Sequence, residues 1–322
     1  MSYTCHPVVA PTEHHRTPRM ARPMKALITG ADGFVGRHLS RHLTACGDTV
    51  IGVDRPAGPD LLDPAALDAL LAEVRPDVVY HLAGWSDIGA SWNAPRECFE
   101  VNATGTLNLL QACIAHGSPR VLAVSSADVY GRVDPADLPI NEETPFRPVT
   151  PYAASKIAAD QLALQAWLGF GLEVLRVRAF NHLGPGQSTN FVAPGIADRI
   201  ARNERDGVSA VPVGNLTPRR DITDVRDVVR AYRLLIEHGE PGEAYNVCSG
   251  RDLAIAELAE LLVGMANVPM HLEADPDLQR PVETPVLLGD PTRIRQTTGW
   301  VPEISIETTL ADVLDDRRRL LA

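Results

Sequence analysis

A glycine-rich segment follows the first apolar run of the chain, and it restricts the fold more than any other feature. Residues 25–29 have the pattern of a buried strand, and Gly30, Gly33 and Gly36 follow where the next helix is expected to begin. Glycines in such a turn let the backbone bend tightly and approach a pyrophosphate, whose charge the helix N-terminus favours. The segment therefore predicts a strand–loop–helix unit that binds a dinucleotide.

The first half of the chain alternates between strand and helix patterns. Further strands are predicted at 49–54, 77–82, 120–125 and 173–180, and helices at 33–45, 64–73, 95–116 and 152–167, the last with Thr150 as N-cap and Pro151 as first helical residue. This alternation favours an α/β fold with a doubly wound parallel sheet of the Rossmann type and ligand at the carboxyl ends of the strands. We assign this domain to residues 24–180.

The pattern loosens after residue 180. Residues 181–187 are rich in Gly and Pro and are predicted as a loop. Helices are predicted at 191–203, 224–237 and 255–266, and strands at 208–213 and 243–249. We expect residues 181–322 to form a smaller C-terminal substrate-binding lobe, interleaved with the sheet.

Composition narrows the function classes. The chain has 322 residues, 30 Lys and Arg against 41 Asp and Glu, and a net charge of −11, so we expect no nucleic-acid partner. No apolar run reaches the length of a membrane span, and the five cysteines show no CxxC, which favours a cytoplasmic protein with reduced thiols and no metal site. Residues 1–23 lack the apolar core of a signal peptide and are predicted to be a disordered tail.

Tyr152 and Lys156 stand four positions apart at the start of a predicted helix, and therefore on one face of it. An ammonium beside a phenol favours the phenolate, so we expect the pKa of Tyr152 to be lowered and the phenol to move a proton to or from an alcohol or ketone. A solvated helix face would show the same pair. The order glycine loop, then Ser126 and Asp128 after a strand, then the tyrosine helix, favours catalysis.

Asp54 ends the second predicted strand, near the spacing of about 20 residues after the first glycine at which an acid holds the adenosine ribose. An acid there would repel a 2′-phosphate and favours NAD(H), whereas the adjacent Arg55 weakens that preference towards NADP(H). Asp54 is alternatively a strand-end turn residue. We expect Asp60 and Leu61 to lie near the adenine.

Taken together, these residues resemble the extended short-chain dehydrogenase/reductase family from Lys25 to the C-terminus. The family's motifs match the three glycines, His81-Leu82-Ala83, Asn102 with Gly105 and Thr106, Ser126, and Tyr152 with Lys156. The resemblance implies Ser126, Asp128, Tyr152 and Lys156 as catalytic residues. It implies that the cofactor contacts the three glycines, Asp54, Arg55, Asp60 and Leu61 together with Phe34, Val35, Leu82, Ala83, Gly84, Asn102, Tyr152 and Lys156.

Segments of the second half resemble the family members that act on GDP-mannose derivatives. These segments are 180–187, 214–216, 219–221, 224–227, 245–250 and 280–283. The resemblance implies a GDP-sugar site formed by Ser86, Ser126, Asn181, Asn190, Val192, Gly214, Asn215, Arg220, Arg280 and Glu283. Arginine is suited to the two phosphates because its planar fork matches phosphate oxygens. Surface ion pairing is the alternative for these arginines, most of all for Arg219.

The resemblance implies one of three reactions on a nucleotide sugar. The first is NAD(P)H-dependent reduction of the C4 ketone of a GDP-4-keto-6-deoxy-hexose, which would make GDP-D-rhamnose or its C4 epimer. The others are 4,6-dehydration of GDP-mannose and C4 epimerisation. Dehydration needs a carboxylate base, and Asp128 is one methylene shorter than the Glu of the dehydratases, which favours reduction. A non-catalytic dinucleotide sensor is disfavoured because Ser126, Tyr152 and Lys156 are all present.

The resemblance also implies a homodimer built from the helices predicted at 95–116 and 152–167. Apolar or neutral side chains on these helices fit a two-helix face, namely Leu107, Leu110, Ile114, Ala158, Leu162 and Gln165. Ordinary packing on the sheet would use many of the same residues.

Overall fold

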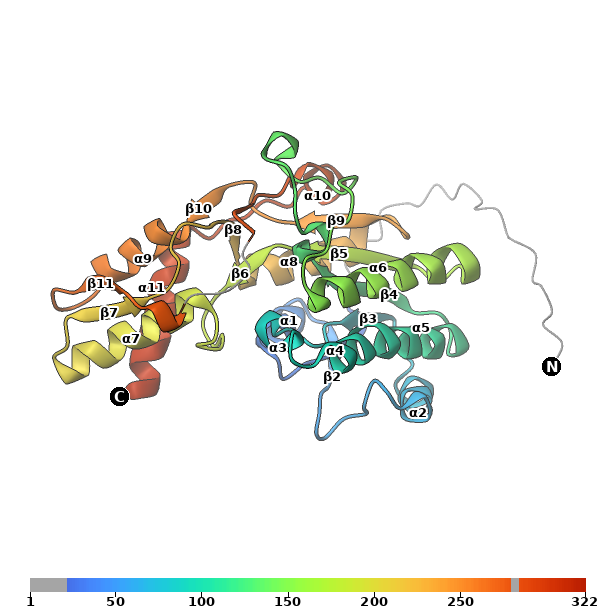
Figure 1. Ribbon diagram of the computed structural model, residues 1–322. Helices are drawn as coiled ribbons and strands as arrows, with labels where there is room; N and C mark the ends of the chain where they lie inside the picture. Colours follow the sequence, from blue (N-terminus) through green and yellow to red (C-terminus); the bar gives the residue numbers. More distant parts are fainter. Residues whose placement is uncertain (1–21, 279–283) are drawn as a thin grey trace.

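The computed structural model describes residues 22–278 and 284–322 (Figure 1). Residues 1–21 of the predicted tail, and the predicted site residues Arg280 and Glu283, lie outside the described residues. Within the described part of the chain, none of the helices combines the length and apolar character that crossing a membrane requires.

A six-stranded sheet organises the larger part of the molecule. Its strands are β1 (Lys25–Thr29), β2 (Thr49–Val53), β3 (Val78–His81), β4 (Arg120–Ser126), β5 (Val174–Ala179) and β9 (Ala244–Val247), in the order β2-β1-β3-β4-β5-β9. Every neighbouring pair is parallel. The strand order runs outward in both directions from β1 and β3, which confirms the predicted doubly wound Rossmann-type sheet and brings the strands' carboxyl ends to one edge.

Helices cover both faces of this sheet. One core cluster joins the strands to α1 (Phe34–Ala45), α8 (Val225–His238) and α10 (Thr292–Thr298). A second cluster joins the opposite face to α2 (Pro64–Val74), α5 (Gly105–Ala115) and α6 (Pro151–Phe170). Because α8, β9 and α10 return to the first layer, the second half of the chain is interleaved with the sheet.

The helix predicted over residues 95–116 forms with an irregularity at its centre. It consists of α4 (Pro95–Phe99), a π-helical turn η1 (Glu100–Thr104) and α5, and a short helix α3 (Ile88–Ser91) that we did not predict precedes it. A π turn inserts an extra residue into the helix and is often retained where it aims a particular side chain. Here it carries Asn102, which is 2% exposed.

The tyrosine helix α6 begins where the sequence predicts and runs three residues further. The Thr150 side chain accepts a hydrogen bond from the backbone N–H of Ala153 at 3.0 Å, and Pro151 is the first helical residue. One turn beyond Lys156, the buried Asp160 accepts hydrogen bonds from Arg176 at 2.7 Å and Arg178 at 3.2 Å on β5. These contacts fix α6 to the sheet and therefore fix the direction of the side chains on its first turn.

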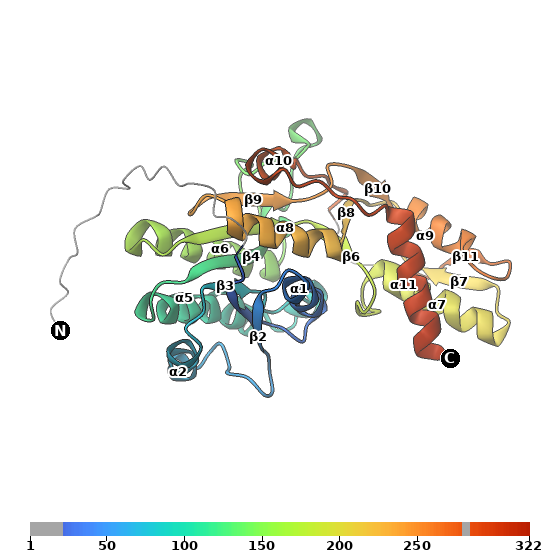
Figure 2. The ribbon, with the colours of Figure 1, turned by 180° about the vertical axis from the view of Figure 1, so that it is seen from behind.

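The remaining elements form a smaller lobe beside the sheet (Figure 2). Its strands are β6 (Asn181–Leu183), β7 (Ala210–Val213), β8 (Arg219–Asp224), β10 (Asp252–Ala254), β11 (His271–Ala274) and β12 (Val286–Leu287), and its helices are α7 (Val192–Asp206), α9 (Ile255–Gly264) and α11 (Ile306–Leu321). A short 3₁₀ turn, η4 (Pro276–Leu278), also lies here, whereas the turns η2 (Ala127–Tyr130) and η3 (Pro135–Asp137) follow β4 of the larger sheet. A separate apolar core holds α7, α9 and α11 together.

Two predictions for this lobe were wrong. Residues 181–183, predicted as loop, form β6, and no strand was predicted at β8, with which β6 pairs in parallel. Both strands are short, and β8 is rich in charged residues, so neither has an apolar pattern of its own. Each is stabilised by pairing with segments far away in sequence, β10 and β12 among them.

The predicted interface residues divide between the protein core and the surface. Leu110 was wrongly assigned to a subunit interface, since it is 2% exposed and packs in the cluster beneath α5 and α6. Ile114 and Leu162 are half-buried against that cluster, whereas Gln165 is exposed. The sheet has therefore taken part of the face that we assigned to a partner subunit.

Candidate active site

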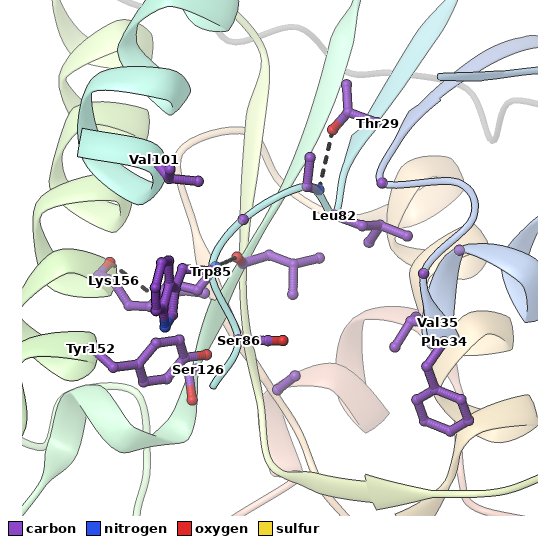
Figure 3. A pocket seen from close by; sticks show the side chains of 18 of the residues that line it. Thr29, Phe34, Val35, Leu82, Trp85, Ser86, Val101, Ser126, Tyr152 and Lys156 are labelled. Atoms are coloured by element: carbon purple, nitrogen blue, oxygen red, sulfur yellow. Dashed lines mark hydrogen bonds between the residues drawn. The ribbon is translucent and has the colours of Figure 1, made fainter. Parts of the chain in front are cut away.

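A cavity of about 480 Å³ opens at the carboxyl ends of β1, β3, β4 and β5. In Figure 3, Ser126, Tyr152 and Lys156 gather at one side of it, and Phe34 and Val35 face them from the other. The predicted site residues that line the cavity are Gly30, Gly33, Phe34, Val35, Gly36, Asp54, Arg55, Asp60, Leu61, Leu82, Ala83, Gly84, Ser86, Ser126, Asp128, Tyr152, Lys156 and Asn181. The structure thus brings the predicted catalytic residues and nearly all predicted cofactor contacts to one place.

The glycine loop forms the edge of the cavity next to α1. Gly30 has a φ of +76°, and a Cβ at Gly36 would lie 2.1 Å from the Gly30 carbonyl oxygen. A side chain at either position would therefore require the backbone to move. The loop leaves the N-terminus of α1 facing the cavity, which is the arrangement that favours a phosphate.

Asp54 and Arg55 lie beyond the glycine loop, at the end of β2. The Asp54 carboxylate accepts hydrogen bonds from the backbone N–H groups of Asp32 at 3.0 Å and Arg55 at 2.8 Å. Asp54 therefore also braces the turn, the alternative role we considered for it. The Arg55 side chain is 63% exposed and lies 3.3 Å from Asp60, so it remains available at the cavity edge.

Asn102 does not itself line the cavity but holds its wall. Its side chain accepts from the Trp85 backbone N–H at 2.8 Å and donates to the Trp85 carbonyl at 3.2 Å. It also donates to Ser155 Oγ at 2.8 Å, and Ser155 donates to the Tyr152 carbonyl at 2.7 Å. The π turn therefore places one amide that locks the loop after β3 to the helix carrying Tyr152.

His81 of the predicted HLA motif is buried, and its side chain connects β3 to β1 and α5. Its ring nitrogens lie 2.8 Å from Thr29 Oγ1 and 3.0 Å from Thr106 Oγ1. Burial lowers the pKa of His81 to about 3, so the ring is neutral. It joins β1, β3 and α5 directly below the cavity.

Ser126, Asp128 and Tyr152 form a hydrogen-bonded group. Ser126 Oγ donates to Asp128 Oδ2 at 2.9 Å and accepts from the Asp128 backbone N–H at 3.2 Å, and Tyr152 is hydrogen-bonded to Ser126. Burial raises the pKa of Asp128, while the hydrogen bond from Ser126 and the charge of Arg220 lower it. Three groups able to move or hold a proton thus meet at the end of β4.

Our expectation for the pKa of Tyr152 was wrong for the protein on its own. Burial raises the pKa of Tyr152, the charge of Asp128 raises it further, and the hydrogen bond with Ser126 opposes both. Lys156 donates from Nζ to the Val124 carbonyl at 2.9 Å, and burial lowers its pKa to about 8. Desolvation therefore outweighs the stabilisation that we expected the ammonium to give the phenolate.

Several predicted substrate residues do not line the cavity. Asn190 and Val192 are exposed around the start of α7. Gly214 and Asn215 follow β7, where the Asn215 side chain accepts from the Thr217 backbone N–H at 3.0 Å. These four residues lie in the smaller lobe, although Phe191, which stands between Asn190 and Val192, lines the cavity.

Arg220 lies on β8 of the smaller lobe, within electrostatic reach of Asp128. Its Nη1 donates to the carbonyls of Arg219 at 2.9 Å and Thr284 at 2.8 Å, and its charge acts on Asp128. Both of these bonds go to backbone carbonyls, whereas the surface ion pairing that we considered for this arginine would go to a carboxylate. The side chain instead connects β8 with the segment leading into β12, close to the cavity.

Sequence reasoning missed a further group of lining residues. They are Thr29, Val53, Pro59, Leu67, Trp85, Ile88, Val101, Val124, Ser125, Ala127, Ala179, Phe180, His182, Gln187, Phe191, Tyr232 and Leu287. Trp85 stands between two predicted residues, and Phe180, His182 and Gln187 belong to the segment from which only Asn181 was selected. Tyr232 gave no signal, because its helical spacing is that of a core residue.

A parallel Rossmann-type sheet, a glycine loop and a cavity with Ser126, Tyr152 and Lys156 define an extended short-chain dehydrogenase/reductase. A family model described as GDP-mannose 4,6 dehydratase matches residues 57–313. The chain belongs to this family.

Individual relatives are similar over nearly the whole chain. A GDP-6-deoxy-D-mannose reductase from Pseudomonas aeruginosa is 43% identical over 295 residues, 91% of this chain and 96% of that protein. A solved structure of RMD from Pseudomonas aeruginosa complexed with NADPH has a TM-score of 0.85 at 42% identity and covers 92% of this chain and 99% of that one. A GDP-mannose 4,6-dehydratase from Yersinia enterocolitica is 26% identical, with 90% of this chain and 92% of that protein covered.

Proposed function

We propose that this protein reduces the C4 ketone of a GDP-4-keto-6-deoxy-hexose with NADPH or NADH. The observation that carries the proposal is the meeting of Ser126, Tyr152 and Lys156 beside the glycine loop in a single cavity. The substrate class follows from the 43% identity to a GDP-6-deoxy-D-mannose reductase across nearly the full length of both chains.

The cavity fits a nicotinamide dinucleotide. The glycine loop and the N-terminus of α1 would receive the pyrophosphate, and Asp54, Arg55, Asp60 and Leu61 would surround the adenosine. When bound, the nicotinamide supplies the hydride. Asp54 favours NAD(H), yet the RMD structure holds NADPH. Arg55, exposed at the cavity edge, offers the positive charge that a 2′-phosphate needs.

Tyr152 serves as the proton donor to the ketone oxygen. Because burial raises its pKa, the phenol is protonated at neutral pH, which is the state that a reduction requires. Ser126 Oγ donates its proton to Asp128 in the free protein, and on substrate binding it would turn this proton to the ketone oxygen and stabilise the charge that develops there. Lys156, held by the Val124 carbonyl, carries a positive charge below about pH 8 and would offer it to the ribose of a bound cofactor.

Dehydration of GDP-mannose is the second candidate, because Asp128 lines the same cavity. A dehydratase needs a carboxylate that takes the proton from C5. Asp128 already accepts a hydrogen bond from Ser126 at 2.9 Å and is one methylene shorter than Glu. We therefore assign Asp128 to the orientation of Ser126. Exchange of the C5 hydrogen with deuterated solvent, abolished in Asp128→Asn, would assign it as a base instead.

We extend the proposal to the product, the assembly and the compartment. The product is GDP-D-rhamnose, formed in the cytoplasm, where the free thiols of Cys46, Cys98, Cys113 and Cys248 remain reduced. The protein is a homodimer that pairs the exposed sides of α5 and α6. Light scattering at micromolar concentration should give twice the mass of one chain, and a monomer would overturn the assembly.

Product analysis tests the reaction. The protein is incubated with GDP-4-keto-6-deoxymannose plus NADPH or NADH, and separately with GDP-mannose, and the products are identified by mass and NMR. Consumption of the keto sugar with matching oxidation of coenzyme supports reduction, and the C4 configuration names the product. Conversion of GDP-mannose into the keto sugar without net coenzyme use would contradict it.

A further inference from the structure

Two tyrosines are fully buried with hydroxyl groups that have no hydrogen-bond partner among the described residues. They are Tyr80 on β3 and Tyr232 on α8, each 0% exposed and each in the core cluster between the sheet and α1 and α8. A buried hydroxyl without a partner costs free energy, so such a group needs an explanation. The two differ in one respect: Tyr232 lines the cavity and Tyr80 does not.

The cavity that Tyr232 lines has apolar side chains that suit a flat, largely apolar group. Val124 on β4, Ala179 on β5 and Leu287 on β12 line the same cavity. The ionised form of Tyr152 would raise the pKa of Tyr232, which places the two phenols within electrostatic reach of each other. Tyr232 therefore lines the cavity within electrostatic reach of Tyr152, one of the proposed reacting groups.

The nicotinamide ring matches this environment. It is planar and apolar on both faces, and it carries one polar substituent, a carboxamide. The Tyr232 hydroxyl has already lost its contact with water in the folded protein. A hydrogen bond to the carboxamide therefore requires the side chain to turn towards the cavity, but no further desolvation of the hydroxyl. On this basis, and resting on the proposed function, we infer that Tyr232 is a cofactor-positioning residue whose hydroxyl hydrogen-bonds the nicotinamide carboxamide.

Binding measurements on the free protein test this without turnover. Calorimetry gives Kd for NADPH and for 2′-phospho-ADP-ribose, which has the same adenosine and pyrophosphate but no nicotinamide. Tyr232→Phe should weaken NADPH binding about threefold to tenfold, the range of one hydrogen bond, and leave the binding of the fragment unchanged. Tyr80→Phe removes the same atom from the same core cluster outside the cavity, and it should change neither affinity.

The outcomes separate this inference from the function it rests on. Unchanged NADPH affinity in Tyr232→Phe overturns the inference, and so does an equal loss for NADPH and the fragment, which would indicate a general disturbance. A raised KM for the keto sugar with unchanged NADPH affinity would place the hydroxyl on the sugar and also overturn it. If the unmodified protein binds neither NADPH nor NADH, the proposed function itself fails.

Discussion

The two sides of the cavity differ in how many of the predicted site residues line them and in the contacts that fix those residues. On the side of the larger sheet, the wall is fixed by short polar contacts: Asn102 holds Trp85, Thr150 caps α6, and Asp160 fixes the same helix to β5. On the side of the smaller lobe, Asn181 is the only one of the predicted sugar contacts within residues 22–278 and 284–322 that lines the cavity. The predicted reacting groups are therefore held in the cavity wall by contacts within the larger part of the molecule, while most described residues predicted to contact the sugar nucleotide lie in the smaller lobe and do not line the cavity.

The largest expected effect is a loss of turnover on substitution of Tyr152, on the side of the larger sheet. Tyr152→Phe removes the proton donor and keeps the ring, so turnover should fall by about 10²- to 10⁴-fold, the usual contribution of a positioned general acid. The Kd for the GDP-sugar should stay within about twofold. Steady-state kinetics and calorimetry measure the two quantities, and a variant with normal turnover would remove Tyr152 from the mechanism.

The burial of Lys156 on the same side of the cavity can be tested through the pH dependence of the free energy of unfolding. Its folded-state pKa of about 8 lies below its ordinary value of 10.5, so between these pH values the unfolded chain binds the extra proton. Stability should therefore rise with pH across this window, by about 3 kcal/mol relative to Lys156→Met. Urea unfolding of both proteins from pH 7 to 10.5 measures this difference. A constant difference would mean that burial does not perturb Lys156.

On the side of the smaller lobe, Arg220→Ala should weaken binding of the GDP-sugar by about 10- to 100-fold, since a charged hydrogen bond to phosphate is worth roughly 1.5–3 kcal/mol. Arg219 is the matched control because it is paired with Asp252 instead. Arg219→Ala should change the affinity little. Equal losses in both variants would show that the effect comes from disruption of β8.

Substitution of Arg55 should have the smallest effect of these changes, and it should alter the binding of NADPH but not that of NADH. Its side chain is 63% exposed, so Arg55→Ala should raise the Kd for NADPH only a few-fold. The Kd for NADH should not change, because that coenzyme lacks the 2′-phosphate. Fluorescence titration with both coenzymes measures the ratio, and an unchanged ratio would exclude Arg55 from phosphate recognition.

The same contrast explains which parts of the site could be predicted from sequence. Gly30 and Gly36 act through the backbone, and Thr150 acts within one turn of its own helix, so local sequence is enough to locate them. Tyr232 could not be found in this way, since its position on α8 has the spacing of a core residue, and only the fold brings it to the cavity. The strand β8 was missed because its stability comes from partners distant in sequence.

The pKa values of Tyr152 and Lys156 could not be predicted from the sequence for a related reason. Their spacing predicts one helix face, and the structure confirms that both residues line the cavity. The spacing carries no information on burial, and burial dominates both values. A phenol that keeps its proton suits a reduction better than the lowered pKa that we expected.

Isotope transfer tests the central claim most directly. The keto sugar is incubated with NADPH deuterated at C4 of the nicotinamide, on the face from which hydride is transferred, and the product is examined by NMR. The proposed reduction predicts one deuterium at C4 of the 6-deoxy sugar per coenzyme oxidised, and loss of this product in Tyr152→Phe. A protein that leaves the keto sugar and the coenzyme unchanged while converting GDP-mannose would contradict the account.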